Sequence, residues 1–178
     1  SKEMELNNKN IDMIGNGLTI TEERKKNMLF TDPYLENLQI IVVQAGSDIK
    51  NKSDLAGKKV GTQTGSSSND ALEADEATFK SLDEVVGYPD NLEALMDLAT
   101  GRIAAVVVDE VLGRYYISKN PEKYKVLEDH FGSEEYGVGL RLTDKALRDE
   151  LQRVLDEMKA DGTSAEISKK WFGEDIVK

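Results

Sequence analysis

Strands and helices alternate along residues 59–127, and this alternation limits the possible folds more than any other feature of the sequence. Lys59 opens a short β-prone run, and a helical pattern follows the turn at Gly65. Residues 104–109, Ala-Ala-Val-Val-Val-Asp, form an uninterrupted apolar strand of the kind that is buried on both faces of a sheet. Strands that alternate with helices predict βαβ units, a parallel sheet and right-handed crossovers.

Polar residues stand where two of these strands end. Ser66 and Ser67 follow Gly65, and either hydroxyl can cap the helix whose backbone N–H groups would attract an anion. Asp109 ends the apolar strand, and ligands of such sheets bind at the carboxyl ends of the strands. An anion site beside a carboxylate suits a zwitterion such as an α-amino acid. The alternatives are an ordinary βα turn for the serines and a helix cap for Asp109.

Arg24 is a second candidate for anion binding. It follows Thr21, which is suited to cap a helical turn that carries Glu22 and Glu23 near its start. The planar guanidinium of Arg24 offers a fork of donors to a carboxylate. The alternative is a surface ion pair between Arg24 and one of the two glutamates.

Composition excludes several classes of function. The net charge of −11 argues against a nucleic acid or an anionic membrane as partner. The absence of cysteine removes disulfides, thiolate catalysis and cysteine-based zinc sites. His130 is the only histidine, no Gly-x-Ser-x-Gly motif accompanies it, and we predict that it is a solvated surface residue. No metal-ligand spacing is present, so we expect neither a metal nor a cofactor.

Further elements are expected around the alternating region. The helix over residues 91–100 should end at Gly101 and bury Leu92, Leu95, Met96 and Ala99. The other predicted strands are residues 11–14, 27–30, 38–43, 84–88, 124–127 and 136–141. The other predicted helices are one that ends near Lys9, one that stops before Pro121, one over residues 144–159, and one with Trp171 and Phe172.

Several segments match a known family in the order in which they occur. They are Gly-Leu-Thr-Ile-Thr-Glu-Glu-Arg at 17–24, Phe-Thr-Asp-Pro-Tyr at 30–34, residues 54–61 with 65–67, residues 98–109, Glu-Tyr-Gly-Val-Gly at 135–139, and residues 161–173. Together they resemble the polar amino-acid substrate-binding proteins of ABC importers, over nearly the whole chain.

The resemblance implies an α/β, periplasmic-binding-protein-like fold. Two lobes, each with a mixed, mostly parallel sheet flanked by helices, would close on one ligand. Lobe one would comprise about residues 1–40 and 137–178, and lobe two residues 41–136, with hinges near 38–44 and 134–140. Family members begin with a strand, a helix and a second strand that this sequence lacks, so lobe one is predicted to be incomplete. We therefore expect a domain-swapped or edge-paired dimer, or ligand binding that is weakened or lost.

The resemblance also assigns roles to individual residues. Arg24 would hold the α-carboxylate of the ligand, with help from the backbone of Thr19 and of Ser67. Asp109 would accept the α-ammonium group, which the carbonyl of Gly17 would share.

The pocket wall would be completed by Asn16, Gln63 and Ser66. Gln63 stands where family members vary with their ligand, so it is the candidate for specificity. The implied function is the extracytoplasmic component of an ABC importer, periplasmic or a cell-surface lipoprotein, that delivers a polar α-amino acid to a membrane permease. No catalysis is implied. The alternatives are a ligand-sensing receptor domain and a cyclohexadienyl-dehydratase-like enzyme, for which Glu110 is the candidate acid.

Overall fold

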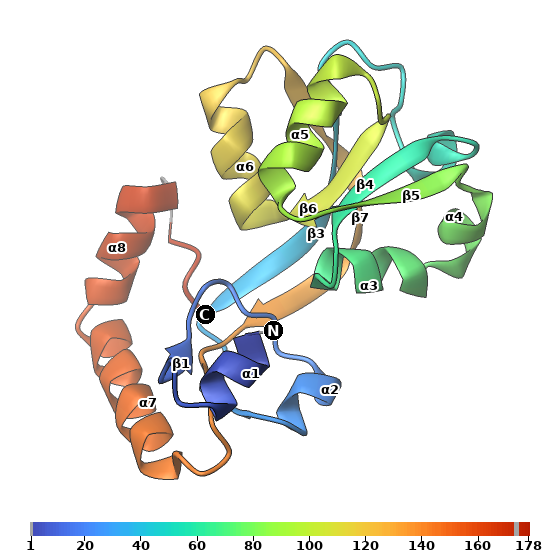
Figure 1. The fold of residues 1–178 in the computed structure, drawn as a ribbon. Coiled ribbons are helices and arrows are strands. Elements are labelled where there is room, and N and C mark those ends of the chain that lie inside the picture. Colours follow the sequence, from blue (N-terminus) through green and yellow to red (C-terminus); the bar gives the residue numbers. More distant parts are fainter. Residues whose placement is uncertain (1, 173–174) are drawn as a thin grey trace. The chain divides into compact units, whose positions relative to one another are not determined.

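The computed structural model describes residues 2–172 and 175–178 and divides into two compact units (Figure 1). Unit 1 consists of Ser1–Glu36 and Glu134–Lys178, and unit 2 of Asn37–Ser133. The chain passes from unit 1 into unit 2 within β3 (Leu35–Gln44) and returns within β7 (Tyr124–Tyr136). These crossings lie a few residues before the lobe boundaries that the sequence suggests.

Unit 2 is built on a five-stranded sheet with the strand order β5-β4-β6-β3-β7. The strands of the predicted βαβ region are β4 (Lys59–Gln63), β5 (Glu84–Tyr88) and β6 (Ala105–Asp109), of which β5 lies at an edge of the sheet. β4 pairs in parallel with both β5 and β6, as predicted, whereas β6 pairs antiparallel with β3. The sheet is therefore mixed.

Helices cover both faces of this sheet (Figure 1). α5 (Asn91–Thr100) and α6 (Glu110–Lys119) pack on one face, against Ile40 and Val106. The opposite face is covered by η1 (Lys52–Leu55), α3 (Ser67–Ala74) and α4 (Glu76–Ser81). Successive strand residues point to opposite faces, and both faces of this sheet are covered. Residues 40–43 of β3 and 105–108 of β6 are therefore all buried and form continuous apolar runs.

The buried face of α5 agrees with the prediction at Leu95 and differs from it at the other predicted positions. Leu92 and Met96 are 47% and 59% exposed, and the residues that pack on the sheet are Ala94, Leu95 and Leu98. The sequence of α5 carries two overlapping apolar faces. The small side chain of Ala94 lets the backbone approach the sheet closely, whereas the long side chain of Met96 would hold it away.

β7 is much longer than the predicted strand at residues 124–127. It occupies the edge of the sheet, and its exposed and buried positions intermix. Polar residues therefore continue the strand without forming an apolar run. Gly132 lies within β7 at a φ of +112°, a conformation that favours glycine.

Unit 1 contains a three-stranded sheet with the order β1-β8-β2. Its strands are β1 (Met13–Ile14), β2 (Leu29–Phe30) and β8 (Gly139–Leu140). β8 is antiparallel to both neighbours, so the mostly parallel pairing predicted for lobe one is wrong for these strands. β1 and β2 run in the same direction, but β8, from the returning part of the chain, lies between them.

The helices of unit 1 are α1 (Lys2–Asn7), α2 (Glu22–Lys25), α7 (Lys145–Ala160) and α8 (Thr163–Phe172). Its small core contains Leu6, Ile14, Leu18 and Met28. Gly139 packs against this core, where an added Cβ would come within 2.7 Å of Leu18 Cδ2. Over the ranges that the structure describes, the helices are too short or too polar to cross a membrane.

A buried tyrosine makes the stability of unit 2 sensitive to alkaline pH. The hydroxyl of Tyr88 donates to Asp97 Oδ2 at 3.0 Å. Burial, and then the hydrogen bond and charge of Asp97, raise the pKa of Tyr88 from 10.0 to about 12. The unfolded chain therefore loses this proton first as the pH rises, so the contribution to stability is complete below about pH 10 and is lost between pH 10 and 12.

The unfolding free energy of the wild-type protein should therefore fall as the pH rises from 10 to 12. We predict that this fall is less steep in Tyr88→Phe, by about 1.4 kcal/mol per pH unit, because the variant has no hydroxyl to titrate. Urea denaturation at a series of pH values between 8 and 12 measures this slope in both proteins. Equal slopes would contradict the prediction.

Candidate functional site

The ends of β4 and β6 lie at one edge of the sheet in unit 2. Val60 pairs with Ala105 and Gly61 with Val106 in parallel, so Gln63 and Asp109 end neighbouring strands that run in the same direction. The polar residues that the sequence places at strand ends are therefore brought to a common edge, as expected for a ligand site.

Ser66 rather than Ser67 caps α3. The Oγ of Ser66 accepts a hydrogen bond from the backbone N–H of Asn69 at 3.3 Å, and the turn before it has Gly65 at a φ of +67°. Ser67 is the first helical residue, and its Oγ accepts from Nε2 of Gln39 at 3.3 Å. The alternative that the sequence left open is decided by this geometry.

The carboxylate of Asp109 does not cap α6. No side-chain hydrogen bond joins it to the start of that helix, so the interpretation of Asp109 as a helix cap is wrong. Its Oδ1 instead accepts from Gln39 Nε2 at 2.6 Å and from Asn37 Nδ2 at 3.1 Å. The cause is register, because Gln39 is the cross-strand partner of Asp109 in the β3–β6 pair.

Asn37 and Gln39 contact the candidate residue Asp109, and the sequence reasoning singled out neither of them. They are 1% and 2% exposed. The available signal was Gln39 itself, which interrupts the apolar run of residues 38–43, since a buried amide has to find hydrogen-bond partners.

Gln63 already uses both ends of its amide. Its Nε2 donates to the carbonyl of Pro89 at 3.1 Å, and its Oε1 accepts from Nδ2 of Asn91 at 3.2 Å. These bonds tie the end of β4 to the loop before α5. A polar contact of Gln63 with a ligand would have to compete with them.

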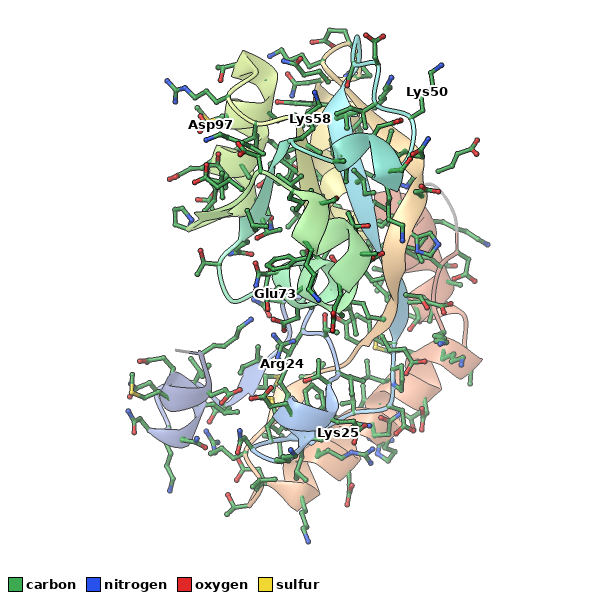
Figure 2. The ribbon with its side chains drawn as sticks, turned by 90° about the vertical axis from the view of Figure 1, so that its right-hand side faces the viewer. Arg24, Lys25, Lys50, Lys58, Glu73 and Asp97 are labelled. Carbon is green, nitrogen blue, oxygen red and sulfur yellow. The ribbon has the colours of Figure 1, made fainter. Side chains whose placement is uncertain are left out.

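Arg24, labelled in Figure 2, belongs to unit 1 and is half-buried, and it forms no ion pair with a residue that the structure describes. Its Nη1 donates to the carbonyl of Thr19 at 2.8 Å, and Thr21 caps α2 as predicted by accepting from the Arg24 backbone N–H. Lys25, one residue further around the helix, pairs with Glu22 at 2.7 Å. No carboxylate contacts the Arg24 guanidinium among the residues described, so its interpretation as a surface ion pair is wrong.

The loop between β1 and α2 holds the remaining predicted residues of unit 1. Thr19 is 3% exposed, and its hydroxyl donates to Glu134 Oε1 at 2.7 Å. Gly17 has a φ of +74°, and an added Cβ would lie 3.3 Å from the ring of Tyr136. Asn16 is exposed. No sequence pattern marked Glu134 as a partner of this loop.

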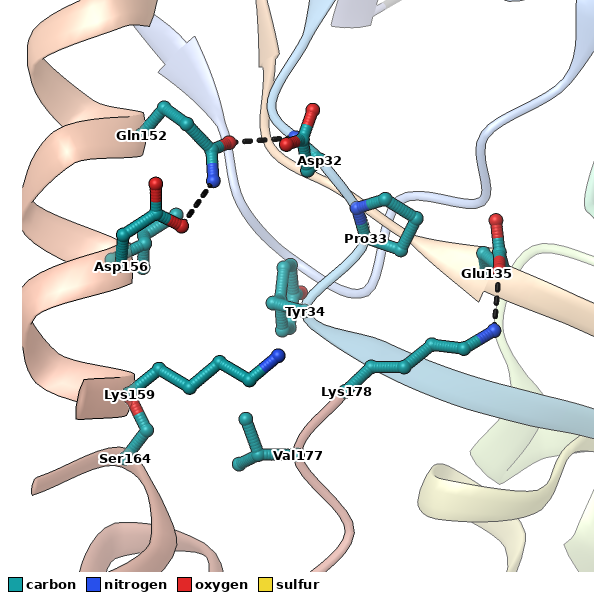
Figure 3. A pocket seen from close by; sticks show the side chains of 11 residues that line it. Asp32, Pro33, Tyr34, Glu135, Gln152, Asp156, Lys159, Ser164, Val177 and Lys178 are labelled. Atoms are coloured by element: carbon teal, nitrogen blue, oxygen red, sulfur yellow. Dashed lines mark hydrogen bonds and ion pairs between the residues drawn. The ribbon is translucent and has the colours of Figure 1, made fainter. Parts of the chain in front are cut away.

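A pocket of about 310 Å³ lies in unit 1 among residues 32–34, α7 and the C-terminal segment (Figure 3). The predicted ligand-binding residues are not among those that line it. Tyr34 forms part of its wall, and burial raises the pKa of the Tyr34 hydroxyl, an effect that a hydrogen bond with the backbone of Gly17 partly offsets. Lys178 of the same wall is paired with Glu135.

Two further candidates can be placed. His130 is exposed, as predicted, and its Nδ1 accepts from the backbone N–H of Gly132 at 3.0 Å. Glu110, the acid that a dehydratase-like mechanism would use, pairs with Arg114 at 2.6 Å on α6.

The chain belongs to the family described as bacterial extracellular solute-binding proteins, family 3, which it matches over residues 2–174. It is 34% identical over 175 residues to the L-cystine-binding protein TcyJ of Escherichia coli (strain K12), covering 97% of this chain and 64% of that protein. It is 35% identical over 173 residues to the glutamine-binding protein GlnH of Bacillus subtilis (strain 168), with coverages of 96% and 61%. The chain thus spans less than two thirds of the length of these relatives.

Solved structures agree with this assignment. A substrate-binding protein of an ABC uptake transporter from Streptococcus pneumoniae, with bound histidine, matches with a TM-score of 0.93 at 34% identity, covering 99% of this chain and 74% of that one. An ancestral arginine-binding protein bound to arginine matches with a TM-score of 0.87 at 39% identity, with coverages of 96% and 76%. The α/β, periplasmic-binding-protein-like fold predicted from the sequence is confirmed.

The cap of α3 can be tested by stability. We predict that Ser66→Ala lowers the free energy of unfolding by about 1 kcal/mol, because the N–H of Asn69 loses its acceptor. Ser66→Asp should retain most of the wild-type free energy of unfolding, because aspartate also caps helices well. Urea denaturation at neutral pH measures both variants, and equal destabilisation by alanine and aspartate would rule out the capping role.

Proposed function

We propose that this chain binds a polar α-amino acid as part of the substrate-binding component of an ABC importer. The observation that carries the proposal is that Arg24, within unit 1, and Asp109, within unit 2, each present a half-buried charge. Neither side chain forms an ion pair with any residue that the structure describes. Each is held by neutral groups, the carbonyl of Thr19 and the amides of Asn37 and Gln39.

Charges that are partly removed from water are costly unless they are paired. An α-amino acid carries a carboxylate of the kind that Arg24 can pair with and an ammonium group of the kind that Asp109 can pair with. The names of the relatives support this class of ligand, since they describe proteins that bind cystine and glutamine, and solved relatives hold histidine and arginine.

The roles proposed for the residues are those that the family resemblance implies. Arg24 takes the α-carboxylate through a guanidinium fork, together with backbone N–H groups of Thr19 and Ser67. Asp109 accepts the α-ammonium group, which the carbonyl of Gly17 shares.

The side chain of the ligand is assigned to Asn16, Gln63 and Ser66. Gln63 contributes mainly its aliphatic part, because Pro89 and Asn91 already occupy its amide. Its proposed role in specificity is to shape the wall and to exchange these hydrogen bonds for bonds to particular ligands.

The proposal extends to the setting in which binding takes place. The family is described as bacterial and extracellular, which supports a location in the periplasm or, as a lipoprotein, at the cell surface. The partner is then the membrane permease of the importer, and the chain is not a catalyst. The two alternatives expected from the sequence, a domain-swapped or edge-paired dimer and ligand binding that is weakened or lost, stay predictions.

Calorimetric titration of the chain with polar L-amino acids tests the proposal. We expect saturable binding of one or a few of them, and Arg24→Ala should weaken it at least about tenfold, because the ligand carboxylate loses a charged donor. Lys25→Ala is the matched control, since it removes only an exposed ion pair of the same helix. A wild-type chain that binds none of the amino acids contradicts the function, and equal effects of the two substitutions contradict the role of Arg24.

The ammonium contact can be tested separately. We predict that Asp109→Asn weakens binding of an L-amino acid at least about tenfold, because the ammonium group loses a charged acceptor. The same substitution should leave the affinity for the deaminated carboxylic acid within about twofold, since that ligand has no ammonium group to contact. Titrations with arginine, histidine and glutamine and their deaminated analogues measure the difference. Equal losses for both kinds of ligand would make Asp109 a structural residue.

A further inference from the structure

One buried amide contacts two of the predicted ligand-binding residues of unit 2. Nε2 of Gln39 lies 2.6 Å from Asp109 Oδ1 and 3.3 Å from Ser67 Oγ. These partners belong to different elements, the end of β6 and the start of α3. Gln39 is 2% exposed, so its side chain is fixed by its surroundings and not by solvent.

Asn37 reinforces the same arrangement. Its Nδ2 donates to Asp109 Oδ1 at 3.1 Å, and its Oδ1 accepts from the backbone N–H of Val111 at 3.4 Å. Two amides thus converge on one oxygen of the Asp109 carboxylate. Within the described ranges, no donor contacts the other oxygen, Oδ2.

The neutrality of both donors matters for binding. A lysine or arginine in their place would form an ion pair with Asp109 and compete with a cationic ligand. Amide donors orient a carboxylate without neutralising it, much as outer-shell partners orient the ligands of a metal.

We infer that Gln39, assisted by Asn37, is a positioning residue that turns Oδ2 of Asp109 toward the primary ammonium group of the ligand. By bonding to Ser67 as well, Gln39 sets the distance between the ammonium acceptor and the start of α3. The inference rests on the proposed function, and it adds residues that do not themselves contact the ligand.

The first test uses the free protein. The side-chain amide proton signals of Gln39 and Asn37, assigned by their loss in Gln39→Met and Asn37→Leu, should move upfield in Asp109→Ala, because a charged acceptor is removed. The amide of Gln44 is the matched control, since it lies on the same strand but donates to the carbonyl of Ala99 at 3.1 Å. Signals of Gln39 and Asn37 that do not respond to Asp109→Ala would overturn the inference.

The second test measures ligand selectivity. Gln39→Met keeps the length of the side chain and removes the donor. It should lower the affinity for L-arginine, L-histidine or L-glutamine about fivefold to tenfold. Binding of the deaminated analogue should stay within about twofold, and Gln44→Met should change neither affinity. Gln39→Leu serves as the second variant if the first does not fold.

The outcomes separate the inference from the proposed function. The first outcome is that the wild-type chain binds the amino acid, and Gln39→Met lowers the affinities for the amino acid and for its deaminated analogue equally. Gln39 is then a structural residue, so the inference fails while the proposed function stands. If the wild-type chain binds none of the three amino acids, the proposed function fails. The role of Gln39 in turning Asp109 toward the ammonium group of the ligand then fails as well. The amide signals still decide whether Gln39 and Asn37 hold Asp109.

Discussion

The burial of β3 and β6 on both faces is the constraint on which the rest of unit 2 depends. Alternate residues of these strands enter two separate cores, Ile41 and Val43 on one face and Ile40 and Val42 on the other. Two apolar faces require helices on both sides of the sheet, and these helices must start or end at the strand ends. Polar residues such as Asp109 are therefore gathered at one edge of the sheet, where they do not disturb either core.

The two charged residues proposed to bind the ligand are held by neutral partners, whereas a charged residue next to each of them in the sequence forms an ion pair. Arg24 donates a hydrogen bond to a carbonyl, and Asp109 accepts hydrogen bonds from two amides. The neighbouring residues Lys25 and Glu110 instead form ordinary ion pairs within their helices. Half-buried charges without counter-ions reduce stability. A sequence retains such a feature most readily where a ligand supplies the missing charge, which is why local departures from stable pairing mark candidate sites.

Local chemistry made much of the fold predictable. Thr21 before two glutamates identified the start of α2, and Gly101 identified the end of α5, where it adopts a φ of +76°. The apolar run that ends in Asp109 identified β6. The buried face of α5 was not predictable, because its sequence offers two apolar faces and only packing against the sheet selects Ala94 over Met96. The length of β7 was hidden for a similar reason, since an edge strand needs no apolar run.

The sequence by itself determined most of the elements, the family resemblance, and the candidacy of Arg24 and Asp109, although it did not predict α4 or the full length of β7. These depend on residue type and short-range spacing, which a chain carries before it folds. Only the tertiary structure decided what each candidate contacts. The antiparallel register of β3 against β6 placed Gln39 opposite Asp109, across 70 residues of sequence. Such pairing arises from the burial of whole strands, so no local pattern could show that an amide in an apolar run would hold the carboxylate of the site.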